Sequence, residues 1–225
     1  MRIARFIAKS GLCSRRDAEK LILEGKVSVD GLVINSPALN IEEHNVITIS
    51  GKKIENVQEA KMWLYYKPVG LITTHKDPQN RPTVFDALKD KLPSRVISVG
   101  RLDINSEGLL LLTNDSDIAR YFESPKNKVE RIYKVRAFGA SRPINIQNKK
   151  IVIDGIIYKP KSIKLISKNG ANSWYEVILT EGKNREIRKI FSHFGFEVNR
   201  LIRTKFGQYE LGDMKPSEYR MVKLP

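Results

Sequence analysis

The sequence has little of what disulfide-bonded, metal-binding or membrane-spanning proteins need. Its one cysteine, Cys13, has no partner within the chain, which excludes an internal disulfide. The three histidines lie at no metal-ligand spacing, so we expect no metal and no cofactor. No apolar stretch approaches the roughly 18 residues that span a bilayer. Because Arg2, Arg5 and Lys9 interrupt any signal-peptide core, we expect a cytoplasmic protein that does not contact a membrane.

Acidic residues are scarce relative to basic ones. The 225 residues include 25 Asp and Glu against 40 Lys and Arg, which gives a formal net charge of +15. An excess of this size indicates a polyanionic partner. The chain is 41% hydrophobic and long enough to fold as one or two domains with a real core.

Residues 1–55 have the pattern of a small module of two helices followed by short strands. Ser14 and Asp17 have the spacing of a capping box, and Gly25 ends the second helix. Asp30-Gly31 between alternating apolar residues predicts a tight hairpin. The stretch GLCSRRDAEKLILEGKVSVDG resembles an S4 domain, a small RNA-binding module. The resemblance implies a basic helix face against the RNA backbone, formed here by Arg5, Arg15, Arg16 and Lys20.

A larger domain is expected over residues 62–225, after a linker at residues 56–61 that lacks apolar periodicity. Residues 61–225 hold 31 of the 40 basic residues and 17 of the 25 acidic ones. This surplus indicates that the larger domain also contacts the polyanion.

The richest stretch of the larger domain is GRLDINSEGLLLLTND, residues 100–115. The apolar run Leu109 to Leu112 is short enough for a fully buried strand, and Gly108 and Asn114 bound it. Asp103 then lies in a loop at the mouth of a core strand, where functional side chains are often found. A helix is expected to follow over residues 116–122.

Two further segments carry polar residues within regular patterns. Residues 129–138 alternate as a strand that contains Tyr133, for which a place in the core is the ordinary reading. Ile187, Ile190 and Phe191 repeat at helical spacing, which leaves Arg185 off this stripe and Arg188 at its edge. A strand with Leu201 and Arg203 is expected to follow.

Four motifs in this order resemble the RsuA/RluB family of ribosomal RNA pseudouridine synthases: KPVG, GRLDINSEGLLLLTND, RIYKV and EGKNREIRKIF. Ser106 and Lys189 depart mildly from the family pattern. The resemblance implies an α+β fold, in which the S4-like module precedes a mixed, mainly antiparallel sheet with flanking helices. It further implies an active site whose residues we assign as follows. The catalytic residues are Asp103, Tyr133 and Arg188, the last paired with Asp103; the pocket residue is Leu201; RNA contacts are Arg101, Lys67 and Arg185.

The implied reaction detaches uracil from ribose C1′, rotates it and reattaches it through C5. Asp103 would attack carbon or abstract a sugar proton, and the sequence leaves both routes open. The motifs are closest to the large-subunit enzymes, so we expect a monomeric enzyme acting on 23S ribosomal RNA, free or in a ribosome assembly intermediate. A 16S target and a non-catalytic ribosome-assembly protein are alternatives. A glycoside hydrolase using Asp103 and Glu107 is a third, although we expect Glu107 to be solvated or to cap a turn.

Overall fold

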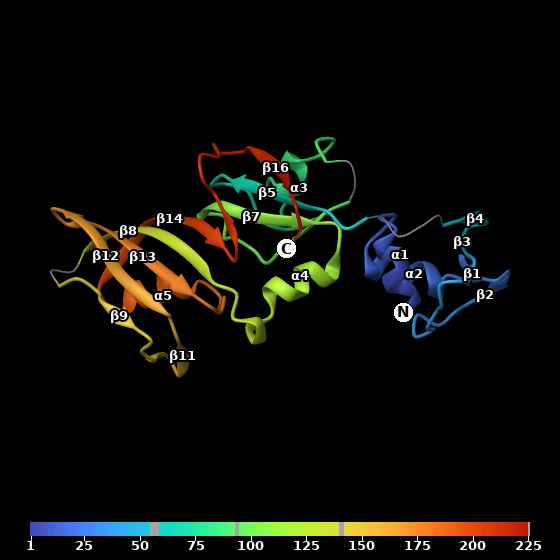
Figure 1. The fold of residues 1–225 in the computed structure, drawn as a ribbon, viewed down its shortest axis with the longest axis horizontal. Helices are drawn as coiled ribbons and strands as arrows, with labels where there is room; N and C mark the ends of the chain where they lie inside the picture. The colour runs from blue at the N-terminus through green and yellow to red at the C-terminus, as the bar shows by residue number, and fades with distance from the viewer. Residues whose placement is uncertain (55–58, 93–94, 140–141, 225) are drawn as a thin grey trace.

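The computed structural model describes residues 1–54, 59–92, 95–139 and 142–224, and it has the predicted α+β architecture. Two sheets dominate it, one in the N-terminal module and one in the rest of the chain. The module lies at one end of an elongated molecule, with the large sheet extending away from it (Figure 1). Residues 55–58 fall outside the described residues, and they include 56–58, half of the expected linker at 56–61.

The N-terminal module packs two helices on a four-stranded sheet of order β2-β1-β3-β4. The helices are α1 (Ile3–Lys9) and α2 (Arg15–Leu23), and the strands are β1 (Val27–Val29), β2 (Leu32–Val33), β3 (Ile47–Ile49) and β4 (Lys52–Lys53). The capping box predicted at Ser14 is present, with reciprocal bonds to Asp17. The hairpin at Asp30-Gly31 also forms, because both residues adopt positive φ and Val29 pairs with Leu32. Buried aliphatic side chains of both helices and of β1 and β3 form one core.

The large sheet has the order β16-β5-β7-β14-β8-β13-β12-β9. Its strands are β5 (Met62–Lys67), β7 (Glu107–Thr113), β8 (Arg131–Gly139), β9 (Ile146–Gln147), β12 (Ser162–Asn169), β13 (Asn172–Leu179), β14 (Phe196–Phe206) and β16 (Tyr219–Val222). Two short strands pair beside this path, β6 (Ile97–Ser98) with β7 and β15 (Tyr209–Glu210) with β14. All of these pairs are antiparallel except β14 with β7, which is parallel. A separate hairpin joins β10 (Ile151–Ile153) to β11 (Ile156–Tyr158).

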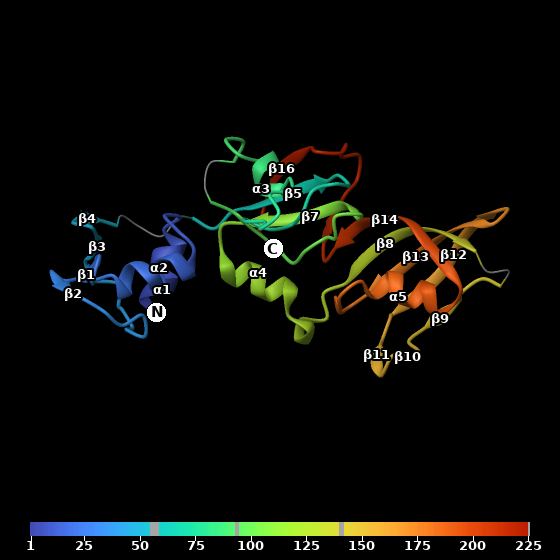
Figure 2. The same cartoon turned by 180° about the vertical axis from the view of Figure 1, so that it is seen from behind.

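Short helices cover the two faces of this sheet, as the view from behind also shows (Figure 2). They are α3 (Val84–Ala87), α4 (Ser116–Glu123), the 3-10 turn η1 (Pro125–Asn127) and α5 (Glu186–His193). Leu110 and Leu112 of β7 join the core under α5, whereas Leu109 and Leu111 join the core under α4. The short apolar run is therefore buried on both faces, as predicted.

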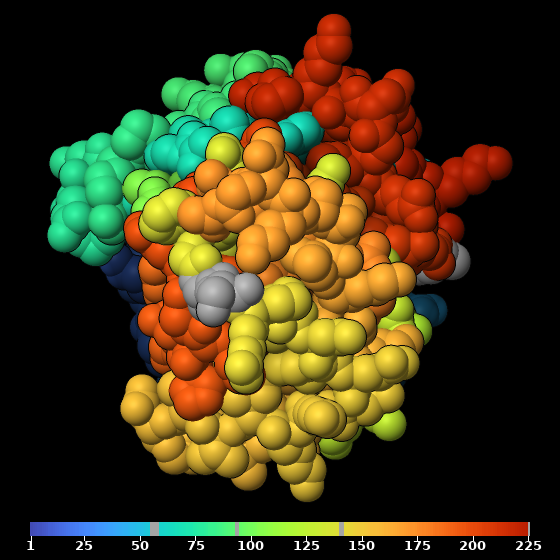
Figure 3. All heavy atoms as spheres, turned by 90° about the vertical axis from the view of Figure 1, so that its left-hand side faces the viewer, coloured from blue at the N-terminus to red at the C-terminus, as the bar shows by residue number. Residues whose placement is uncertain are grey.

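The end of the molecule opposite the N-terminal module is formed by the strands from β9 to β13 (Figure 3). Several large apolar side chains are exposed there, among them Val152 and Ile166. No helix of the described residues is long and apolar enough to cross a membrane.

The parallel pair of β7 and β14 depends on a glycine. Gly108 adopts φ +103°, and a Cβ atom at this position would lie 2.4 Å from the main-chain oxygen of Arg203. Any larger residue would push the two strands apart. Gly108 thus permits the close approach that brings β14 beside the loop containing Asp103.

Candidate active site

A cavity of about 500 Å³ opens beside the polar turn that precedes β7. It lies between that turn, the start of β8, the segment leading into α5, and β14. Six residues predicted from the sequence line it: Arg101, Asp103, Tyr133, Arg185, Arg188 and Leu201. Its volume falls within the range of small-ligand sites. The fold thus gathers residues from three of the four motifs, together with Leu201 of β14, around one space.

The Asp103 loop, residues 101–106, is held from the side of β5 by hydrogen bonds to its main-chain carbonyl groups. Thr73 Oγ1 donates to the oxygen of Leu102 at 2.9 Å. The main-chain nitrogen of Gly70 donates to the oxygen of Ile104 at 2.8 Å. The segment that follows the KPVG motif is therefore a support for this loop.

Two basic side chains complete the support of the Asp103 loop. Lys67 Nζ donates to the main-chain oxygens of Asp103 at 3.1 Å and Ser106 at 2.8 Å. Arg188 Nη2 donates to the oxygen of Asn105 at 2.8 Å. The loop's last five carbonyl groups each have a donor, whereas the Asp103 side chain remains 37% exposed at the cavity. Such a loop holds its carboxylate in place before any substrate binds.

The predicted RNA contact of Lys67 needs correction. Its side chain is 0% exposed, and Nζ also donates to the oxygen of Pro68 at 3.0 Å. Burial lowers the pKa of this ammonium group to about 8, against the opposing effect of Asp103 and Glu107. Lys67 closes the end of a fully buried strand, so it positions the Asp103 loop and has no surface for RNA.

Arg185 and Arg188, at the start of α5, do not contact Asp103 in the way that the sequence predicts. Arg185 Nη1 lies 4.0 Å from Asp103 Oδ2, and this side chain is 48% exposed. Arg188, predicted to pair with Asp103, instead donates to main-chain oxygens, including that of Val198 at 2.7 Å. Burial, and secondarily the charge of Arg185, lowers the pKa of Arg188, whereas Asp103 raises it. Among the described contacts, Arg188 forms no direct ion pair with Asp103. It therefore acts on Asp103 through its hydrogen bond to the loop and through the electric field of its positive charge.

Tyr133 and Leu201 are placed by the register of β8 and β14. Tyr133 is a cross-strand partner of Arg203, and Leu201 is a partner of Val135. Paired residues of neighbouring strands point to the same face of a sheet, so Tyr133, Leu201 and Arg203 share the face at the cavity. Tyr133 is 8% exposed and lines the cavity wall.

Glu107 is neither solvated nor a turn cap, contrary to the sequence interpretation. Its side chain is buried, accepts from Tyr66 Oη at 2.9 Å and pairs with Arg200 Nε at 2.7 Å. These contacts, led by the bond from Arg200, hold the pKa of its carboxyl group below the usual range. Glu107 is also absent from the cavity lining, so it does not form a pair of acids with Asp103 there.

Four polar residues of the cavity wall were missed as site residues from the sequence. Ser106 and Arg203 are almost fully buried, as are Arg131 and Glu186. Burial raises the pKa of Glu186 to about 7. Polar residues usually face solvent, so their residue types alone do not predict a place in the site. Only their positions in or beside the recognised motifs could have indicated that they belong to it.

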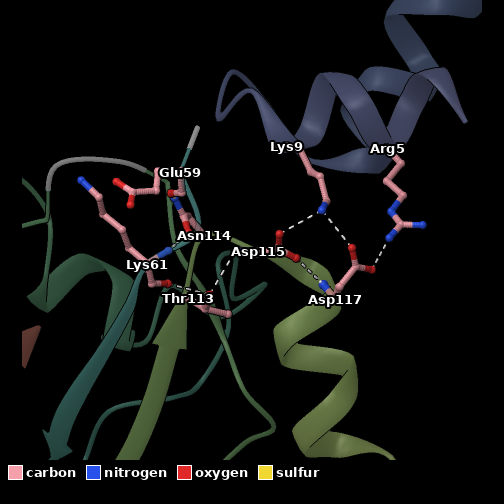
Figure 4. Close-up of polar contacts among 8 residues, drawn as sticks. All are labelled: Arg5, Lys9, Glu59, Lys61, Thr113, Asn114, Asp115 and Asp117. Carbon is pink, nitrogen blue, oxygen red and sulfur yellow. Dashed lines mark hydrogen bonds and ion pairs between the residues drawn. The ribbon is translucent and has the colours of Figure 1, made fainter. Parts of the chain in front are cut away.

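The basic residues of the N-terminal module divide into two groups. Arg5 is engaged in an ion pair with Asp117 of α4, and Lys9 contacts Asp115 and Asp117 beside it (Figure 4). The expected exposed phosphate contact of Arg5 is thus occupied by a carboxylate in this structure. The other predicted RNA contacts of the module, Arg15, Arg16 and Lys20, are exposed on α2.

No group of three or more potential metal-ligating side chains occurs among the residues that the structure describes. The side chains that line the cavity include a carboxylate, a tyrosine and several guanidinium groups.

Comparisons with known proteins agree with this arrangement. Residues 61–193 match the family model described as RNA pseudouridylate synthase, and residues 1–47 match that of the S4 domain. A solved structure described as a pseudouridylate synthase is similar, with a TM-score of 0.66 and 25% identity over 99% of this chain and 96% of that one.

Curated relatives are similar over nearly the whole chain. A Rickettsia bellii protein named as an RNA pseudouridine synthase is 59% identical over 98% of this chain and 96% of its own length. A Yersinia pestis protein named ribosomal large subunit pseudouridine synthase B is 38% identical over 93% of this chain and 68% of its own length. The Pasteurella multocida protein of the same name is 38% identical over 93% of this chain and 63% of its own length.

Proposed function

The chain belongs to the family of RNA pseudouridine synthases, and from this premise we propose that it isomerises a uridine of 23S ribosomal RNA with Asp103 as the catalytic carboxylate. The observation that carries the assignment of Asp103 is its position: a partly exposed carboxylate at a cavity, on a loop whose last five carbonyl groups each have a hydrogen-bond donor. The choice of the large subunit rests on the similarity to proteins that carry that name.

The reaction breaks the bond between C1′ and N1 of uracil, forms a bond between C1′ and C5, and transfers the C5 proton to N1. No atom is lost and no oxidant is needed. Asp103 in its ionised form attacks carbon or removes a sugar proton, and both routes remain open. Arg185, whose Nη1 lies 4.0 Å from Asp103 Oδ2, places a positive charge beside the carboxylate.

Tyr133 and Leu201 supply the faces between which a detached uracil is retained. The tyrosine ring stacks on the base, and its hydroxyl group assists removal of the C5 proton. A stacked uridine reaches this cavity only after it is flipped out, at a cost of a few kcal/mol. Exposed basic residues at the cavity mouth, Arg101 and Arg185, offset that cost through phosphate contacts.

The first experiment compares Asp103→Asn with a matched surface variant, Asp213→Asn, whose side chain is 94% exposed. Conversion of uridine in unmodified ribosomal RNA is measured together with RNA affinity. We expect Asp103→Asn to abolish conversion while affinity stays within a few-fold, and Asp213→Asn to behave as the unaltered protein. Substantial turnover by Asp103→Asn would sink the catalytic assignment.

The second experiment offers unmodified 16S and 23S transcripts separately, together with assembly particles of each subunit. We expect pseudouridine in 23S RNA only. Modification of 16S RNA alone would overturn the choice of subunit, and binding without any conversion would favour the non-catalytic assembly role. Release of free base would instead favour a hydrolase, against which the burial of Glu107 already argues.

A further inference from the structure

Unsatisfied buried polar atoms gather around the cavity. Among the described residues, six buried side-chain nitrogen or oxygen atoms lack a hydrogen-bond partner. Four of them belong to residues of the cavity wall, namely Ser106 Oγ, Glu186 Oε1, Arg188 Nε and Arg203 Nη2. Folded proteins leave few such atoms, because each costs free energy unless a ligand or water satisfies it. Their concentration at one place indicates that polar atoms of a substrate complete the site.

Arg203 is the most constrained of the four. It is 2% exposed on β14, and its Nε donates to the main-chain oxygen of Leu109 at 2.7 Å. Its guanidinium carbon lies 4.9 Å from the centre of the Phe206 ring. These two contacts fix the plane of the group but leave Nη2 without a partner. A fixed donor of this kind can bind an acceptor with little loss of side-chain entropy.

Ser106 lines the same cavity as Arg203. It is the last residue of the Asp103 loop and directly precedes β7, two residues before Gly108, which pairs with Arg203 in the parallel ladder. Ser106 is 1% exposed, so two unpartnered donors lie at the wall that also carries Tyr133.

Two other buried basic residues, Lys67 and Arg131, lie near Arg203. Among the described residues no carboxylate forms an ion pair with it. Burial chiefly lowers the pKa of Lys67 and of Arg131, and the charge of Arg203 lowers both further. Buried positive charge of this kind is costly unless something negative is bound nearby. An acceptor that becomes negative during the reaction would be favoured here more strongly than a neutral one.

We propose that Arg203, assisted by Ser106, donates hydrogen bonds to a carbonyl oxygen of the target uracil and stabilises the negative charge that the ring acquires during isomerisation. The proposal rests on the proposed function. When the bond between N1 and C1′ breaks, its electron pair stays with the base and is shared between N1 and the carbonyl oxygens. That pair then forms the new bond from C5 to C1′, and transfer of the C5 proton to N1 restores the conjugated ring. Arg203 acts on the intermediate charge and exchanges no proton itself.

The test pairs single variants with single-atom changes of the substrate. Arg203→Met is compared on RNA carrying uridine, 2-thiouridine or 4-thiouridine at the target, because sulfur accepts hydrogen bonds more weakly than oxygen. Lys205→Met is the matched control: it lies on the same strand, pairs with Glu210 and does not line the cavity. Single-turnover rates at saturating RNA are measured for every combination.

We expect Arg203→Met to slow conversion of uridine on the order of a hundredfold. The unaltered protein should lose rate with one of the two thio substrates, and Arg203→Met should lose little further rate with that one. Lys205→Met should retain both the rate and the thio effect. If Arg203→Met slows all three substrates in equal proportion, Arg203 is only structural and the proposal fails.

Two additional variants keep the test informative if Arg203→Met does not fold. Ser106→Ala removes only a hydroxyl group, and it should reduce the effect of the same thio substitution. Arg203→Lys keeps the charge with a different donor geometry, and its rate should lie between those of Met and Arg. An unchanged thio effect in both variants would overturn the proposal. The substrate is whichever transcript the protein converts, so a 16S target would overturn the proposed subunit without affecting this comparison.

Discussion

Lys67 Nζ donates to the main-chain oxygen of Asp103 at 3.1 Å, so a buried ammonium group bonds the backbone of the residue assigned to catalysis. The same nitrogen bonds the oxygen of Ser106, at the far end of the loop. One side chain thereby fixes the loop at the residue that carries the carboxylate and again at the end of the loop. A displacement of about 1 Å at such a site is enough to lower turnover a hundredfold.

We predict that Lys67→Met lowers the turnover number by one to two orders of magnitude with little change in RNA affinity. Methionine fills similar space but leaves the carbonyl groups of the Asp103 loop without their donor. Turnover and RNA affinity are measured over a range of salt concentrations. If Lys67 contacted phosphate, its loss would flatten the salt dependence of binding by about 0.7 to 0.9 logarithmic units, and the positioning role would be wrong.

The lowered pKa of Lys67 makes a second prediction. The folded-state pKa is about 8 and the ordinary value is 10.5, so between these pH values the unfolded chain binds the proton that the folded chain has released. Raising pH through this window therefore stabilises the unaltered protein relative to Lys67→Met, by up to about 3 kcal/mol. Denaturant unfolding of both proteins at pH 7.5 and pH 10.5 measures the difference. A pH-independent difference would mean that the pKa is not lowered.

Local patterns predicted much of this fold. The capping box at Ser14, the hairpin at Asp30-Gly31 and the doubly buried run of β7 all follow from residues close in sequence. The parallel pairing of β7 with β14 joins segments about ninety residues apart, and no local pattern contains it. This pairing places Arg203 at the cavity, which explains why its role could not be inferred from its own strand.

The side-chain roles were less predictable than the elements. A lysine at a strand end and a glutamate in a polar turn are ordinarily solvated, yet Lys67 and Glu107 are both buried by contacts with distant residues. For Arg188, the motif predicted a residue near Asp103, but the acceptor oxygens of Asn105 and Val198 are main-chain atoms that the sequence cannot position. The motifs identify the site residues, but the hydrogen-bond partners of these residues can be identified only from the fold.

We predict different consequences for the two arginines near Asp103. Arg188→Lys keeps a positive charge but cannot bond two separate carbonyl groups in the same geometry, so turnover should fall about a hundredfold. Arg185→Lys should change turnover only a few-fold, because its contact with Asp103 is at 4.0 Å and half exposed. Turnover and thermal unfolding are measured for both. Full activity of Arg188→Lys would mean that charge alone matters and that the bonds to the loop do not.

The contact between the N-terminal module and α4 makes the last prediction. Lys9 Nζ lies 2.9 Å from Asp115 and from Asp117, and Arg5 pairs with Asp117 (Figure 4). Asp115 also caps α4 by accepting from the main-chain nitrogen of Asp117 at 2.6 Å. The carboxylates of Asp115 and Asp117 lie at the N-terminus of α4, where the positive end of the helix dipole stabilises negative charge. The basic side chains therefore fix the orientation of the module relative to the catalytic domain.

We expect Arg5→Gln to weaken RNA binding a few-fold, because it removes the ion pair with Asp117. Asp117→Asn should weaken binding at least as much, because it also removes the contact of Asp117 with Lys9. The double variant should lose no more than Asp117→Asn alone, since that change already removes the ion pair with Arg5. By contrast, Arg16→Glu and Lys20→Glu should flatten the salt dependence of binding, because these exposed groups are the predicted phosphate contacts. Affinity across salt concentrations and the radius of gyration from solution scattering measure both effects. If Asp117→Asn strengthens binding while Arg5→Gln weakens it, Arg5 is a phosphate contact that Asp117 masks, and the ion pair does not serve to orient the module.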